Sequence, residues 1–297
     1  MITGADITVI IPTTGDRESE LLQAIESVKR QEVEVASIIV VWDGNCDNPL
    51  LQRRVVDLGV LLLTTKSPYS GVSVARNVGL RKADTLYVAL LDDDDYWLEN
   101  KLKVQLEVLN SGHPNSLGFV GSPTYLLSEK GLERRVHPAT KMVDASWSKF
   151  LFTKIPIFPR GRWISTSSYL FPKTTSNSCF FSESLKVSED LDFFGKLGAG
   201  LPFSLTREAL LVTRIRRSSK SGLSHFPMPF SEWLIWTENF GHYLSQREKA
   251  NLRLVFGTKR IVMQESRKSG LVYFLKNLSM RVDLISVLTA LSFILFP

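Results

Sequence analysis

Residues 85–97 read TLYVALLDDDDYW, an apolar run that passes directly into four consecutive aspartates. The apolar part has almost no polar alternation, which is typical of a strand buried on both faces. Apolar residues also follow the acidic run, at Tyr96, Trp97 and Leu98, so a plain solvated turn explains it poorly. We therefore predict a strand at 85–91 that ends in an acidic site.

Three similar apolar runs precede this strand, and segments with helical spacing of apolar residues lie between them. The expected strands are 7–11, 37–42 and 60–63. The expected helices are 18–30 and 72–82, with a third at 98–109 after the acidic run. Strands that alternate with helices indicate a mostly parallel sheet, because parallel neighbours need crossover connections. We expect an α/β fold with a helical tail from about residue 231.

Polar residues collect just after these strands. In open parallel sheets, ligands bind beyond the carboxyl ends of the strands. The segments at those positions are 12–17 (PTTGDR), 43–45 (DGN) and 92–95 (DDDD).

The acidic run suits a divalent cation. Neighbouring carboxylates disfavour one another's charged forms unless something positive offsets them. Mg²⁺ and Mn²⁺ prefer carboxylate oxygens and often complete their shell with phosphate oxygens. We predict a site for Mn²⁺ or Mg²⁺ at 92–95 that would hold a diphosphate; the alternative is a solvated acidic turn.

A second acidic pair, Glu189 and Asp190, lies in the segment KVSEDLDFFGKL. Ser188 is placed to cap a helix that starts there. Acids favour the first turn of any helix through the helix dipole. A carboxylate at a helix start can equally act as a general base, so both readings stay open from these residues alone.

The charge is unevenly distributed. The net charge of +6 combines −6 over residues 1–110 with +12 over residues 111–297. Such a split fits a phosphate-bearing substrate, nucleic acid or an anionic membrane. Cys46 and Cys179 form no disulfide framework, and residues 1–6 lack a secretory pattern, so we expect a cytoplasmic protein.

Five segments, taken in order, resemble the family 2 glycosyltransferases, which are inverting enzymes with the GT-A fold. They are ITVIIPTTGDR with LLQAIESVKRQ, IIVVWDGNCDN, GVSVARNVGL, YVALLDDDDYWLENKL and FSESLKVSEDLDFF. The resemblance implies a glycosyltransferase domain over 1–230. Its nucleotide-sugar-binding, Rossmann-like half would be about 1–110, and its acceptor and catalytic-base half about 111–230. Residues 231–297 would be a helical C-terminal extension.

The resemblance also implies roles for individual residues. Asp190 would deprotonate the acceptor hydroxyl, and Asp94 would bind the metal directly, with Asp92 as a further ligand. Asp92 and Asp93 would face the ribose and diphosphate, while Asp43 would hydrogen-bond the base. The full nucleotide-sugar set would be Pro12, Thr13, Arg17, Asp43, Arg76, Asn77, Asp92 and Asp93. The chain departs from the family at Trp42, where an aspartate is usual.

The implied reaction is a single displacement by an acceptor hydroxyl on a nucleotide-diphosphate sugar, expected to be a UDP-sugar. Inversion would give a β-linkage, in surface-polysaccharide synthesis on a glycan or lipid-linked glycan. The basic segment 213–225 would supply diphosphate contacts, or would be a solvated loop. Those contacts would be Arg216, Arg217, Lys220 and His225.

The tail combines basic and apolar residues. Residues 245–297 hold nine Lys and Arg against three Asp and Glu, and end in the apolar run 284–297. That run is shorter than the roughly 20 residues that span a bilayer, but suits a helix lying in an anionic membrane surface. We expect a peripheral position on the cytoplasmic face of the inner membrane. The alternative is a helix packed on protein.

Three rival functions compete with this one. A nucleotidyltransferase on a similar sheet would usually carry a glycine-rich basic loop, whereas PTTGDR has one glycine and no lysine. A basic nucleic-acid or membrane-binding protein would have no use for residues 92–95, so no nucleic-acid partner is expected. A transferase-like protein without catalysis is disfavoured by the presence of both Asp94 and Asp190.

Overall fold

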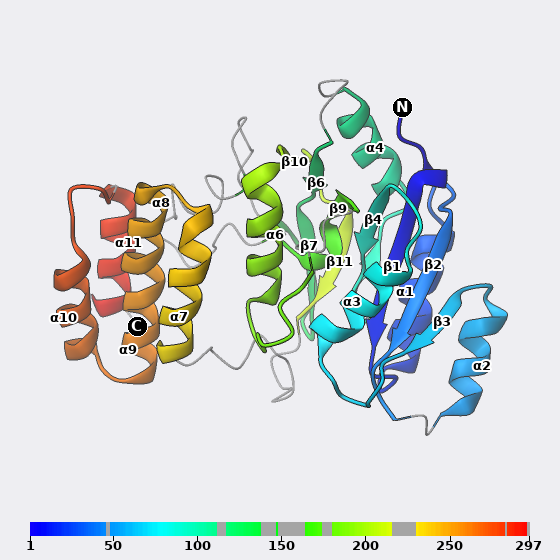
Figure 1. Ribbon diagram of the computed structural model, residues 1–297, viewed down its shortest axis with the longest axis horizontal. Helices are drawn as coiled ribbons and strands as arrows, with labels where there is room; N and C mark the ends of the chain where they lie inside the picture. Colours follow the sequence, from blue (N-terminus) through cyan, green and yellow to red (C-terminus); the bar gives the residue numbers. More distant parts are fainter. Residues whose placement is uncertain are drawn as a thin grey trace.

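The computed structural model describes residues 1–45, 48–111, 117–137, 147, 164–173, 180–215, 230–282 and 284–295. Its centre is a seven-stranded sheet with the strand order β10-β6-β9-β4-β1-β2-β3. Among the described strands of this sheet, β9 runs against its neighbours and the others run in one direction. The mostly parallel α/β sheet predicted from the sequence is therefore confirmed (Figure 1).

The first third of the chain alternates strands and helices as the apolar periodicity indicated. The strands are β1 (Ile7–Thr13), β2 (Ser37–Trp42), β3 (Leu61–Thr64) and β4 (Tyr87–Leu90). The helices are α1 (Glu18–Lys29), α2 (Pro49–Asp57), α3 (Val72–Lys82) and α4 (Lys101–Ser111). Every residue of β1 and β4 is buried, as expected for central strands of a sheet that is covered on both faces.

The middle of the chain completes this sheet and adds a smaller one. Strands β6 (Phe119–Gly121), β9 (Leu170–Pro172) and β10 (Phe203–Leu205) extend the large sheet beyond β4. The smaller sheet has the order β5-β11-β7-β8. Its strands are β5 (Tyr96–Trp97), β7 (Thr124–Ser128), β8 (Gly131–His137) and β11 (Leu211–Arg214).

Two hydrophobic clusters cover the two faces of the large sheet. One cluster contains Leu21 and Ile25 of α1, Val55 of α2 and Leu102 of α4. The other contains residues of α3 and of α6 (Glu189–Gly200), and it continues into the first C-terminal helices. Burial of these apolar side chains on both faces is the main stabilising contribution to the fold.

The C-terminal part is helical, and α6 lies between it and the sheet (Figure 1). The segments are α7 (Phe230–Phe240), α8 (Gln246–Leu252), a π-helical turn (Arg253–Gly257), α9 (Thr258–Gln264), α10 (Arg267–Asn277) and α11 (Leu284–Leu295). Trp233, Trp236 and Phe240 of α7 join the same cluster as Phe193 and Phe194 of α6. These helices are therefore packed onto the α/β part of the chain.

Candidate active site

The ends of three neighbouring strands bring the predicted polar segments to one edge of the sheet. Strand β1 pairs in parallel with both β2 and β4, with Thr13 opposite Trp42 and Ile10 opposite Leu90. Residues 43–45 follow β2 directly, and residues 92–95 follow β4 after Leu91. The carboxyl edge of the sheet therefore carries the acidic run, as the sequence indicated. Pro12 and Thr13 lie within β1 itself and are buried.

Asp93 is held by the last residue of β1 and by the loop that follows this strand. It is 1% exposed and accepts a 2.6 Å hydrogen bond from the hydroxyl of Thr13. Arg17 forms ion pairs with both Asp93 and Asp94, the second at 3.2 Å. Burial raises the pKa of Asp93 to about 6, although Arg17 and Thr13 act in the opposite direction. Asp93 thus joins two loops, while the side chain of Asp94 stays one quarter exposed.

Arg76 joins the two acidic segments that are far apart in the sequence. It lies on α3, is 3% exposed, and donates to Asp92 at 2.8 Å and to Glu189 at 2.9 Å. Burial alone would lower the pKa of Arg76, but these two carboxylates raise it above its usual value. A buried arginine between two carboxylates fixes the start of α6 beside the end of β4.

Asp190 lies in the first turn of α6, at the same site. Its Oδ2 accepts a 3.2 Å hydrogen bond from the hydroxyl of Thr166, and its Oδ1 accepts one of 2.7 Å from the backbone N–H of Leu191. Burial raises the pKa of Asp190, while Arg76 and these hydrogen bonds act to lower it. A carboxylate with a raised pKa is suited to accept a proton near neutral pH. Ser188 occupies the N-cap position, but its side chain makes no capping hydrogen bond there.

Asp43 organises the loop that leads into α3. It is 4% exposed, and it accepts hydrogen bonds from the Thr65 hydroxyl and from the backbone N–H groups of Ser70 and Gly71, at 2.8 to 2.9 Å. Trp42, at which the sequence departs from the family that it resembles, is buried, and its indole N–H donates to the backbone oxygen of Asn45 at 2.9 Å.

The loop after β1 rests on Trp42. Gly15 has φ +83°, and a Cβ at this position would overlap the indole ring of Trp42. The Trp42 side chain therefore supports the 13–17 loop from within the protein.

Asn77 fastens a second loop to α3. Its side-chain amide donates to the backbone oxygen of Phe181 and to Glu183, each at 2.9 Å, and it accepts from the N–H of Phe181 at 2.9 Å. The Phe181 ring also lies 5.1 Å from the Arg76 guanidinium. The Ala-Arg-Asn segment of α3 thus positions residues 181–190, which carry the candidate base.

The chemistry of the acidic residues fits a hard divalent cation bound with substrate. Asp92 and Asp94 are each partly exposed at the carboxyl edge of the sheet. No group of three or more metal-binding side chains gathers within the part of the chain that the structure describes. Mg²⁺ commonly takes one or two carboxylates and completes its shell with water and phosphate oxygens, so this pair of carboxylates suits such an ion.

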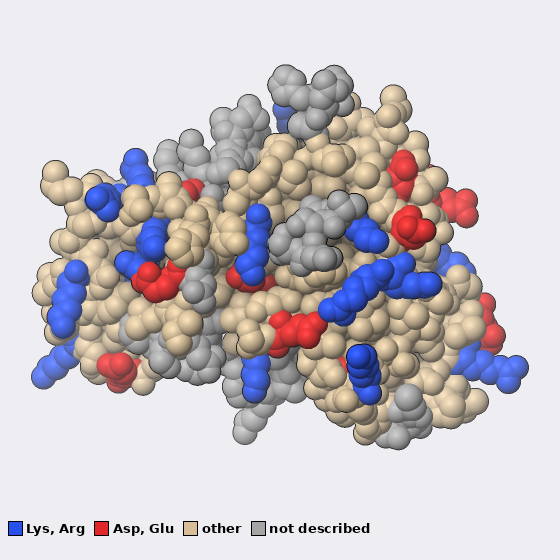
Figure 2. Space-filling view, in the orientation of Figure 1, with Lys and Arg blue, Asp and Glu red and all other residues tan. Residues whose placement is uncertain are grey.

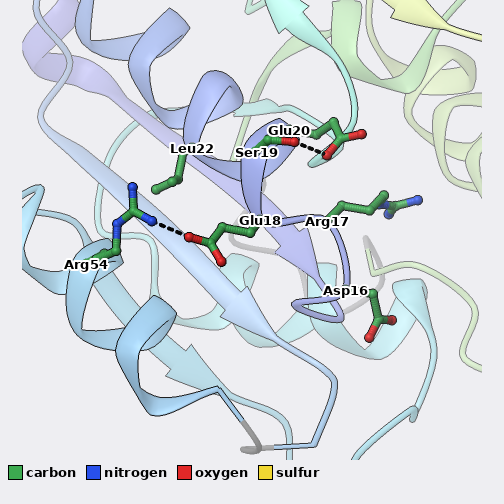
Figure 3. Close-up of a pocket in the computed structure, with 7 residues that line it drawn as sticks. All are labelled: Asp16, Arg17, Glu18, Ser19, Glu20, Leu22 and Arg54. Carbon is green, nitrogen blue, oxygen red and sulfur yellow. Dashed lines mark hydrogen bonds and ion pairs between the residues drawn. The ribbon is translucent and has the colours of Figure 1, made fainter.

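A pocket lies at the start of α1, beside the acidic run. It is lined by Asp16, Arg17, Glu18, Ser19, Glu20, Leu22 and Arg54. Figure 3 shows Glu18 paired with Arg54, and Arg17 extending away from that pair. None of the aspartates at 92–95 lines this pocket, and Arg17 links it to the acidic site through its ion pairs with Asp93 and Asp94.

Some predicted residues lie outside the described part of the chain. These are Arg216, Arg217, Lys220 and His225, together with Cys46 and Cys179.

The segment 165–168 (STSS) was not predicted from the sequence to be part of the site, yet all of it is buried there. Ser167 accepts a 3.0 Å hydrogen bond from the N–H of Asp92, and Thr166 contacts Asp190. A short run of serine and threonine carries no periodic signal, so no pattern in the sequence pointed to it.

Comparison with known proteins identifies the family. The model of glycosyl transferase family 2 matches residues 8–165. The chain belongs to this family, as the five sequence segments indicated.

Two relatives illustrate the similarity. An uncharacterized glycosyltransferase of Rickettsia bellii is 28% identical over 187 residues, covering 62% of this chain and 24% of the relative. The chain thus spans about a quarter of that protein's length. UDP-Glc:alpha-D-GlcNAc-diphosphoundecaprenol beta-1,3-glucosyltransferase WfgD of Escherichia coli is 28% identical over 103 residues, covering 35% of this chain and 40% of WfgD.

A solved structure shares the fold. The crystal structure of S. aureus TarS residues 1–349 in complex with UDP-GlcNAc superposes with a TM-score of 0.62 at 18% identity, covering 92% of this chain and 79% of that chain. The predicted GT-A type of α/β fold is thereby confirmed.

Proposed function

We propose that this protein is an inverting glycosyltransferase that moves a sugar from a nucleotide-diphosphate donor to a hydroxyl of a glycan or lipid-linked glycan, in surface-polysaccharide synthesis. The main support is the meeting of two acidic segments at one site. Arg76 contacts Asp92 at 2.8 Å and Glu189 at 2.9 Å, and Asp190 lies next to Glu189. One arginine thus connects Asp92, which we propose binds the donor, with the helix start that carries the proposed base.

The proposed mechanism assigns the proton transfer to Asp190. Its raised pKa suits it to take the proton of the acceptor hydroxyl as that oxygen attacks the anomeric carbon. A single displacement inverts the anomeric configuration, so an α-linked donor gives a β-linkage.

Asp94 and Asp92 would hold Mn²⁺ or Mg²⁺, which when bound supplies positive charge to the departing nucleoside diphosphate. Arg17, Asp43, Asn77 and the end of β1 would shape the nucleotide-sugar site around it. On this proposal residues 1–110 form the donor half and 111–230 the acceptor half.

The finer assignments follow the relatives. WfgD is named for a UDP-glucose donor, a diphosphoundecaprenol-linked acceptor and a β-linkage, and the TarS structure contains UDP-GlcNAc. We propose a UDP-sugar donor and a lipid-linked glycan acceptor for this chain by analogy.

Purified protein incubated with a panel of nucleotide sugars and Mn²⁺, with nucleoside diphosphate release as the readout, tests the activity. We expect release with at least one UDP-sugar in the presence of a polyprenyl-diphosphate-linked glycan. Asp190→Asn should bind the donor normally and lose turnover. Asp192→Asn is a matched control, because its carboxylate lies on the same helix and pairs with Lys196 instead. Wild-type turnover by Asp190→Asn would refute the assignment of the base.

We propose further that the C-terminal helices contact an anionic membrane surface, which would place the protein peripherally on the cytoplasmic face of the inner membrane. None of the described helices combines the length and apolarity needed to cross a bilayer. One face of α11 is buried, through Ser286, Thr289, Ala290 and Ile294. The alternative from the sequence was that this helix packs on protein. That alternative holds for the buried face of α11.

Helices α10 and α11 and the segment between them expose apolar residues together with basic ones. The exposed apolar residues are Leu271, Val272, Leu275, Leu278, Leu284, Ile285, Leu288 and Leu295. The exposed basic residues are Arg267, Lys268, Lys276 and Arg281. On the face seen in Figure 2, Lys and Arg side chains line the outer edge of the molecule where α10 lies. Mixed apolar and basic surfaces of this kind bind anionic bilayers.

Co-sedimentation with vesicles that contain anionic phospholipid tests this contact. Leu284→Asp combined with Leu288→Asp should lower vesicle binding, because both leucines are exposed. Leu50→Asp combined with Leu61→Asp is the control, since these exposed leucines lie on α2 and β3, in the α/β part. Equal vesicle binding by both double variants would refute the contact. An unchanged oligomeric state of the Leu284→Asp and Leu288→Asp double variant would show that its lower vesicle binding does not come from loss of self-association.

A further inference from the structure

The segment 165–168 lies between the two acidic segments and contacts both. The Ser167 hydroxyl accepts a hydrogen bond from the N–H of Asp92 at 3.0 Å. The next residue back, Thr166, donates its hydroxyl to Oδ2 of Asp190 at 3.2 Å. One short turn thus joins the end of β4 to the start of α6.

This turn is itself firmly held from the opposite side. The indole N–H of Trp97 donates to the backbone oxygen of Ser167 at 2.8 Å, and the Gln105 amide donates to that of Ser168 at 2.7 Å. Gln105 in turn accepts from Lys101 at 2.7 Å. Lys101 is fully buried, its ammonium lies 3.9 Å from the centre of the Trp97 ring, and burial lowers its pKa well below its usual value.

The carboxylate of Asp190 is oriented by two hydrogen bonds. Leu191 N–H fixes Oδ1 and Thr166 fixes Oδ2. The titratable groups that face Asp190 are Arg76 of α3, Asp92 after β4, its neighbour Glu189 and Tyr169. Thr166 differs from these groups, because its side chain is neutral. It donates a hydrogen bond to Asp190 from outside α6, the helix that carries Asp190.

We propose that Thr166 is a positioning residue for Asp190, holding the carboxylate plane so that its proton-accepting lone pair faces the acceptor hydroxyl. This inference rests on the proposed role of Asp190 as the base. Without the Thr166 hydroxyl, the carboxylate keeps the Leu191 N–H at Oδ1 but loses the hydrogen bond that holds Oδ2, so its plane is less tightly oriented. The charged form also loses a donor that favours it, so the pKa of Asp190 rises further.

Thr166→Val tests the proposal, because it keeps the side-chain shape and removes the donor. We expect the turnover number to fall about tenfold, as for loss of one hydrogen bond to a charged group. In a plot of the turnover number against pH, the acidic limb should move to higher pH. The affinity for the donor should stay unchanged. Thr166→Ser keeps a donor and should restore both quantities. Thr166→Ala removes the donor by a second route if valine impairs folding.

Ser168→Ala is the matched control. It removes a buried hydroxyl from the same turn that has no hydrogen-bond partner among the described residues, so turnover and its pH dependence should stay at wild-type values. A wild-type acid limb and turnover in both Thr166→Val and Thr166→Ala would overturn the proposal. Full activity of Asp190→Asn would instead overturn the function on which it rests, so the two failures are distinguishable.

Discussion

Arg76 and Glu189 are 113 positions apart in the sequence, yet they form a buried ion pair of 2.9 Å. Because Arg76 also contacts Asp92 at 2.8 Å, one guanidinium connects the strand end that carries the acidic run with the helix start that carries the candidate base. The local structure around each of these two segments would not fix one segment relative to the other. The relationship makes Arg76 a structural link within the site.

Arg76→Met should be strongly destabilising. Removal of one partner from a buried ion pair leaves uncompensated charge and typically costs about 3–5 kcal/mol. Arg81→Met is the matched control on the same helix, because Arg81 is exposed and its contact with Glu183 is 3.4 Å long. An exposed pair contributes about 0–1 kcal/mol. Urea unfolding of both variants measures the difference, and equal losses would show that Arg76 is no such link.

The strands and helices of the first third could be predicted from the sequence because each has a strong local signal. The fully buried strands β1 and β4 are continuous apolar runs, and α1 places Leu21, Ile25 and Val28 on one face. The edge that gathers the acidic residues then follows from the parallel order of the strands.

The rest of the site depends on contacts that leave no local trace. The link from Arg17 to Asp93 and Asp94 spans more than seventy residues. The turn at 165–168 is polar but wholly buried, and nothing in its composition indicates that burial. No periodic pattern delimits β9, a three-residue strand that enters the sheet between β4 and β6.

Arg17 occupies the place of a counter-ion for Asp94, so its removal should change metal binding. It pairs with Asp93 and with Asp94, and a bound cation near Asp94 would be repelled by the guanidinium. At about 4 Å in water, two unit charges interact by about 1 kcal/mol. Arg17→Gln should therefore tighten Mn²⁺ binding several-fold in the absence of donor.

Titration of Mn²⁺ followed by electron paramagnetic resonance measures this directly, without activity. Arg54→Gln is the control, because Arg54 lines the same pocket but pairs with Glu18. With donor present, Arg17→Gln should bind the nucleotide sugar more weakly, since a positive charge near the diphosphate is lost. Equal Mn²⁺ affinity in the two variants would contradict the counter-ion role.

Gly195 sets how closely the C-terminal helices approach the catalytic part of the chain. It lies in the middle of α6, and a Cβ at this position would overlap the ring of Phe240 at the end of α7. Overpacking in Gly195→Ala should therefore cost about 2 kcal/mol of the free energy of unfolding, as is usual for a core. The better helix propensity of alanine offsets at most about 1 kcal/mol of that loss.

Gly200→Ala is the matched control. Gly200 lies at the end of the same helix, and a Cβ there would meet no atom within 4 Å, so this substitution should be close to neutral. Thermal unfolding of both variants gives the comparison. Limited proteolysis should show the C-terminal helices cleaved earlier in Gly195→Ala alone, because the displaced contact is the one that packs α7 on α6. Equal melting temperatures and equal cleavage would mean that α7 can shift away from α6 without loss.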